Sequence, residues 1–138
     1  MAITQTLVTS FKKESWQAIH DLETDTINIA LYTGAAALDA NTTVYSATDE
    51  TTGTGYTAGG QTLAGAVIST EGKTVYVSFS DAVWVGAEFT ARGALIYNAS
   101  KADRAIAVLD FGADKTAVNT FTVQMPANGV NTAVIRFA

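Results

Sequence analysis

The sequence contains no cysteine, one proline and one histidine, His20, among its 138 residues. Without cysteine the chain forms no disulfide, no thiolate zinc site and no cysteine nucleophile. A lone histidine with no second histidine or cysteine does not complete a typical transition-metal site, so we expect His20 to be a surface or interface side chain. We therefore expect no metal site, no cofactor and no enzymatic activity.

Charged residues are also scarce, at 15% of the chain, and the formal net charge at pH 7 is -5. This sign is wrong for a protein that grips the phosphates of a nucleic acid, so we expect no nucleic-acid partner. No stretch approaches the ~20 apolar residues of a membrane span, and the first residues show no export signal. We therefore expect no membrane partner.

Hydrophobic residues, in contrast, make up 48% of the chain. A chain of this length can bury enough of them to form one core without disulfides. The abundance of alanine, threonine and glycine favours packed strands joined by short turns. We expect residues 1–138 to form a single domain.

One segment near the N-terminus has helical spacing. Either Thr9 or Ser10 can cap the helix, and charged residues such as Glu14 occupy the face expected in solvent. The apolar face, widened by Trp16, is formed by Phe11, Ser15, Ala18, Ile19 and Leu22. We expect residues 1–24 to be a helical arm that packs on the sheet or on a neighbouring subunit.

The remaining pattern is that of β-strands, with apolar residues at every second position. The expected strands are 26–33, 42–46, 61–69, 74–80, 83–90, 93–98, 105–111, 118–125 and 130–137. Continuous apolar runs at Leu95-Ile96 and Val108-Leu109 predict strands covered on both faces. The sequence therefore predicts a mainly β protein: an antiparallel β-sandwich, jelly-roll or immunoglobulin-like, with one N-terminal amphipathic helix.

Residues 35–60 have little periodicity and form a long predicted surface loop rich in glycine and threonine. Loops of this length in a small domain often bind something. We expect Asp49 and Glu50 in this loop to be solvated acids that cap turns. Tyr45 and Tyr56 either contact a partner or pack within the loop.

Five side chains are our candidates for a protein interface. Aromatic and aliphatic groups on a helical arm and in a long loop supply contact area at low entropic cost. The candidates are Phe11, Trp16, Ile19, Tyr45 and Tyr56.

The order and spacing of five segments resemble those of a family of small virion proteins of tailed bacteriophages. The segments are FKKE at 11–14, IALYT at 29–33, GTGYTAGG at 53–60, TARGALIYN at 90–98 and AIAVLDFG at 105–112. The resemblance covers nearly the whole chain. It implies a structural protein present in many copies, with no catalytic residues.

Within that family we expect a head decoration, or cement, protein that binds the major capsid protein lattice and stabilises the capsid. The resemblance implies self-association as a dimer or trimer, synthesis in the host bacterial cytoplasm and a place on the outer surface of the head. The alternative is a tail component, in the tail tip, a fibre or the baseplate, that contacts other tail proteins or host glycans.

Overall fold

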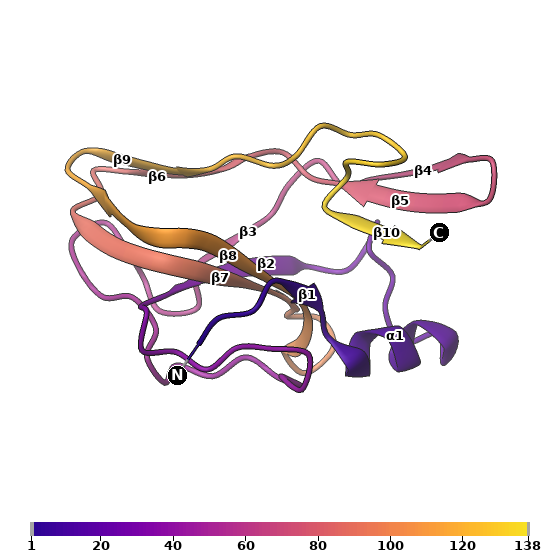
Figure 1. Cartoon of the computed structure of the whole chain (residues 1–138), viewed down its shortest axis with the longest axis horizontal. Coiled ribbons are helices and arrows are strands. Elements are labelled where there is room, and N and C mark those ends of the chain that lie inside the picture. Colours follow the sequence, from indigo (N-terminus) through magenta and orange to yellow (C-terminus); the bar gives the residue numbers. More distant parts are fainter. Residues whose placement is uncertain (1, 138) are drawn as a thin grey trace.

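The computed structural model describes residues 2–137 and is mainly β, with antiparallel strand pairs and one short helix, α1 (Thr9–Trp16) (Figure 1). The largest sheet has the strand order β1-β8-β7-β2-β3. Its strands are β1 (Thr6–Leu7), β2 (Ile27–Tyr32), β3 (Gln61–Thr62), β7 (Phe89–Asn98) and β8 (Arg104–Ala117). No helix in the described residues is long and apolar enough to cross a membrane.

Two smaller sheets complete the fold. One has the order β10-β5-β4, and the other pairs β6 with β9. Their strands are β4 (Val67–Glu71), β5 (Thr74–Ser78), β6 (Ala82–Val85), β9 (Thr120–Val123) and β10 (Ile135–Phe137). Figure 1 shows both small sheets on the same side of the five-stranded sheet.

The centre of the core lies at β2 and β7. Leu31, Leu95 and Ile96 are fully buried, as the continuous apolar run at Leu95-Ile96 predicts. Aromatic rings join this sheet to the β6–β9 pair, with the Phe89 and Phe121 ring centroids 5.1 Å apart. The β6–β9 pair therefore packs against the large sheet.

Several expected strands have different bounds. The strand expected over 61–69 is divided into β3 and β4, with Gly65 at a φ of +69° between them. The strand expected over 83–90 is divided at Gly86, which has a φ of +65°. Residues 42–46 form no strand, and Val44 makes only an isolated bridge to Arg104. Glycines at positive φ end strands that the alternating pattern alone predicts to be longer.

Helix α1 is shorter than expected. It ends at Trp16, and a turn at residues 17–18 follows, with Ala18 at a φ of +58°, so Ile19 lies beyond the helix. The N-cap residue is Val8 and has no side-chain cap, so neither Thr9 nor Ser10 caps the helix. The fully buried Val8 donates its backbone N–H to Ile106 at 3.0 Å, so its strand contact fixes where the helix begins.

The N-terminal segment packs on its own chain. β1 pairs with β8, with Thr6 opposite Val108 and Leu7 opposite Ala107. Phe11 is only 2% exposed and belongs to the core. Of the apolar face expected for the helix, the chain's own core therefore holds Phe11, whereas Trp16 stays 92% exposed.

Candidate interaction surface

A polar network fixes α1 to the end of the five-stranded sheet. Glu14, a buried residue of α1, accepts hydrogen bonds from His20 Nε2 and from Arg104 Nη1, each at 2.9 Å. Nδ1 of His20 lies 3.0 Å from Nδ2 of Asn98. Because Oδ1 of Asn98 accepts the N–H of Ser100, the amide nitrogen faces His20 as a donor. Nδ1 of His20 therefore accepts this hydrogen bond, and the proton of the imidazole ring is on Nε2.

This network overturns two expectations. The His20 side chain is 2% exposed, so it is not a surface histidine, and Glu14 does not face solvent. Burial by itself raises the pKa of Glu14, but the hydrogen bonds from His20 and Arg104 outweigh it and the pKa is lowered. A buried carboxylate with two nitrogen donors holds the helix in one position.

Asp25 extends the network to the loop after β7. Its carboxylate accepts hydrogen bonds from Asn98 at 2.8 Å and from Lys101 Nζ at 2.9 Å. Burial raises its pKa, but the hydrogen bonds from Asn98, from the backbone of Asp21 and from Lys101 lower it to about 2. The segment after α1 is thus tied to the sheet by ionised groups.

The outer side of α1 carries the most exposed large apolar side chain of the described residues, Trp16, at 92% exposure. A shallow groove beside it, the Trp16 groove, continues to Phe137 of β10, which is 38% exposed. The groove is lined by Leu7, Thr9, Lys12, Lys13, Trp16, Gln17, Arg136 and Phe137. Two aromatic side chains from opposite ends of the chain therefore meet at this surface.

The charge of the Trp16 groove is opposite to that of the whole chain. Lys12, Lys13 and Arg136 line it, no carboxylate does, and none of the three is ion-paired within residues 2–137. They are three of the eight lysines and arginines in a chain of net charge -5. An exposed aromatic group with three basic side chains in the same groove fits a partner surface that is apolar and also carries acidic groups.

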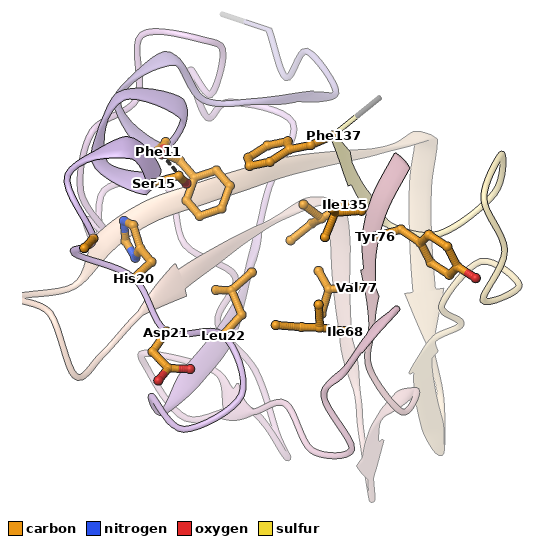
Figure 2. Close-up of a pocket in the computed structure, with 12 residues that line it drawn as sticks. Phe11, Ser15, His20, Asp21, Leu22, Ile68, Tyr76, Val77, Ile135 and Phe137 are labelled. Atoms are coloured by element: carbon orange, nitrogen blue, oxygen red, sulfur yellow. Dashed lines mark hydrogen bonds between the residues drawn. The ribbon is translucent and has the colours of Figure 1, made fainter. Parts of the chain in front are cut away.

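A second hollow, the Phe11 cleft, lies between α1 and the three-stranded sheet and has a volume of about 430 Å³. In Figure 2, Phe11 and Leu22 lie on one side of it and Ile68, Val77 and Ile135 on the other. Phe137 lines both the cleft and the Trp16 groove. The two hollows therefore adjoin at Phe137.

The long loop is held inward by a buried carboxylate. Glu50 is 8% exposed, and its carboxylate accepts hydrogen bonds from the hydroxyls of Tyr45, at 2.6 Å, and Tyr56, and from the N–H of Gly59 at 2.8 Å. The Tyr56 hydroxyl also accepts the backbone N–H of Leu31 at 2.9 Å. Glu50 is therefore not a solvated acid: it anchors residues 45–59 to β2.

Burial and the hydrogen bond to Glu50 raise the pKa of both Tyr45 and Tyr56. The ring of Tyr45 also stacks on that of Tyr97, with centroids 4.8 Å apart. Both hydroxyls therefore donate their hydrogen bonds to a group inside the chain. We expected Tyr45 and Tyr56 either to contact a partner or to pack within the loop, and their contacts are those of packing within the loop.

The structure does not bring the five candidate interface residues to one surface. Phe11 lies in the core, and the half-buried Ile19 follows the turn after α1. Tyr45 and Tyr56 pack under the loop, so Trp16 alone offers a largely exposed side chain.

The neighbours of Trp16 in its groove were not predicted from the sequence. Phe137 lies 121 positions later in the sequence, and only the fold places it beside α1. The sequence feature that pointed to this surface was Arg136, because it interrupts the apolar run from Val134 to Phe137. Lys12 and Lys13 lie four and three positions before Trp16, so a helix places them beside it. The sequence pattern assigned Trp16 to the apolar face and the lysines to the solvent face, and so did not indicate that the tryptophan is exposed among them.

Among residues 2–137, no group of three or more acidic or histidine side chains is placed to hold a metal ion. No family model, curated protein or solved structure matches this chain. The function is therefore inferred from the surface of the chain and from the resemblance of its five segments.

Proposed function

We propose that this chain is a structural protein of a tailed bacteriophage particle, a head decoration protein that binds the outer surface of the major capsid protein lattice. The observation that carries the proposal is the exposed Trp16 in its groove lined by Lys12, Lys13 and Arg136. Tryptophan and arginine are, with tyrosine, the residues enriched at protein-binding hot spots. The five segments that resemble phage virion proteins suggest the class of partner.

The proposed fold is an antiparallel β-sandwich of jelly-roll or immunoglobulin-like type, in which the small sheets form the second layer. Contacts between Phe89 and Phe121, at 5.1 Å, and between Trp84 and Phe89, at 6.5 Å, support this arrangement. A sandwich of this kind gives a rigid body that can be repeated many times on a shell.

The proposed mechanism is stabilisation of the shell by binding. A protein that binds the assembled lattice, and not its separated subunits, shifts the equilibrium towards the assembled shell. The Glu14 network fixes α1 before binding, so little conformational entropy is lost when Trp16 docks. Many copies, each with a modest interface and contacts to its neighbours, then add up over the particle.

The chain in this proposal acts without a cofactor and without catalysis, and it is located on the outside of the head. Its net negative charge keeps it soluble and does not favour binding to packaged DNA. The acidic, apolar surface that fits the Trp16 groove would belong to the major capsid protein.

The proposal is tested by mixing the purified chain with tail-free heads and, separately, with isolated tails of a phage that encodes this sequence. We expect co-sedimentation with heads from which the protein has been stripped. Trp16→Ala should weaken binding about 30-fold, as expected for a hot-spot residue. The matched control is Val85→Ala, because Val85 is 76% exposed on β6, away from the groove.

Immunogold labelling of intact virions shows where the protein lies in the particle, independently of the binding test. Gold over the head supports the decoration role. Gold confined to the tail, or binding to isolated tails only, would overturn it in favour of a tail component.

A further inference from the structure

The outer edge of β4 is open. In the sheet order β10-β5-β4, this strand has a neighbour on one side only, and Figure 1 shows β5 between β4 and β10. Among the described residues, no isolated bridge and no hydrogen bond from outside the sheet reaches residues 67–71. The backbone groups on this edge are therefore available to another strand.

The register of the β4–β5 hairpin shows which groups these are. Glu71 lies opposite Thr74 across a two-residue loop, so these two residues form a hydrogen-bonded pair. Hydrogen-bonded and non-hydrogen-bonded pairs alternate along an antiparallel ladder. Ile68 and Thr70 consequently direct their N–H and C=O groups away from β5.

The side chains of most of this edge do not block pairing. β4 has one charged residue, Glu71 at its end, and residues 67–70 include neither a charge nor a proline, two of the common protections of an edge strand. Val67, at 49% exposure, and Ile68, at 40%, point to opposite faces, so both faces of the strand end are partly uncovered. A strand of this composition is a favourable template for β-pairing.

We propose that β4 pairs antiparallel with β4 of a second copy of this chain, around a two-fold axis at Ser69. In this register Ile68 lies opposite Thr70 of the second copy, and the outward groups of both residues form four N–H···O bonds across the axis. Glu71 lies opposite Val67, so no like charges meet. The two three-stranded sheets become one six-stranded sheet.

The self-complementary register is the reason for choosing a second copy as the occupant. The same edge supplies every donor and acceptor that it lacks, and a two-fold axis makes both halves of the contact identical. Two strands of five residues bury less than the roughly 1,200 Å² of a typical stable interface, so the pair is weak at low concentration. This inference concerns the chain alone and does not rest on the proposed function.

Disulfide trapping in this cysteine-free chain tests the register directly. At the axis, the Ser69 residues form a non-hydrogen-bonded pair with Cα atoms about 4.5 Å apart, within the range of a disulfide. The Thr70 residues of the two copies are offset by about 7 Å along the strands, too far for a disulfide. Thr70→Cys is a stringent control, because Thr70 is the more exposed of the two positions and would trap random collisions more readily.

We expect purified Ser69→Cys to form a disulfide-linked dimer under mild oxidation and Thr70→Cys to remain largely monomeric on non-reducing gels. Adding Thr70→Pro to Ser69→Cys removes an outward N–H and should abolish the dimer, whereas adding Thr70→Ala should not. Circular dichroism checks that each variant retains the fold. Equal crosslinking at both positions, or none at Ser69→Cys in the folded protein, would overturn the proposal whatever the chain binds.

Discussion

The hydroxyl of Tyr45 donates a hydrogen bond of 2.6 Å to the carboxylate of Glu50, within a loop that otherwise looks like solvent-exposed sequence. With Tyr56 and Gly59 as further donors, the carboxylate has its hydrogen bonds satisfied inside the chain. Such a buried carboxylate stabilises the loop only while its donors are in place.

Replacing Glu50 with alanine should therefore destabilise the fold. The change leaves two tyrosine hydroxyls and the N–H of Gly59 without their acceptor, at an expected cost of about 3 kcal/mol in the free energy of unfolding. Urea denaturation followed by circular dichroism measures this value. Asp49→Asn is the control, since Asp49 is an exposed neighbour, and its effect should be within about 0.5 kcal/mol.

Gly60 should tolerate no side chain. It has a φ of +77°, and a Cβ atom at this position would overlap the carbonyl oxygen of Ile29. Gly60→Ala should cost more than about 3 kcal/mol or prevent folding, because backbone strain and overlap with β2 act together. Gly72→Ala, at a φ of +59° with no atom near the added Cβ, should cost only about 1 kcal/mol. Similar melting temperatures for the two variants would show that the loop does not press on β2.

The strands could be predicted from the sequence where alternation or continuous apolar runs report burial directly, as in Ile27, Ile29 and Leu31 of β2. The residue at which α1 ends could not be predicted in this way. The apolar spacing continues to Leu22, but Ala18 adopts a positive φ, and the turn that follows brings His20 back to Glu14. A tertiary contact thus overrides a local pattern.

The candidate surface was predictable only in part. Trp16 stands out in the sequence, but its neighbours Phe137 and Arg136 come from the other end of the chain, and their approach depends on the register of β10 against β5. Glu50 was misjudged because acids in glycine-rich loops usually remain in water. Its donors, Tyr45 and Tyr56, lie five and six positions away, so a short-range signal was present.

Acid should weaken the attachment of the segment after α1. The pKa of Asp25 is about 2 in the folded chain against an ordinary value of 3.8, so the folded state binds this proton less readily than the unfolded state. Its stabilising contribution is complete above about pH 5 and is lost as the pH falls towards 2. The stability difference between the wild type and Asp25→Asn should therefore shrink over this range in urea titrations. A difference that stays constant from pH 5 to pH 2 would contradict this assignment.

Phe11 and Trp16, on the same helix, should respond in opposite ways to truncation. Phe11 is 2% exposed, so Phe11→Ala leaves a cavity in the core and should cost about 3–5 kcal/mol in urea denaturation. Trp16 is 92% exposed and fills no cavity, so Trp16→Ala should change the free energy of unfolding by less than about 0.5 kcal/mol. Because Trp16→Ala leaves the fold intact, any loss of head binding by this variant reports on the interface itself. Strong destabilisation by Trp16→Ala would instead show that the indole packs on its own chain, and Trp16 could then no longer be assigned as the docking residue.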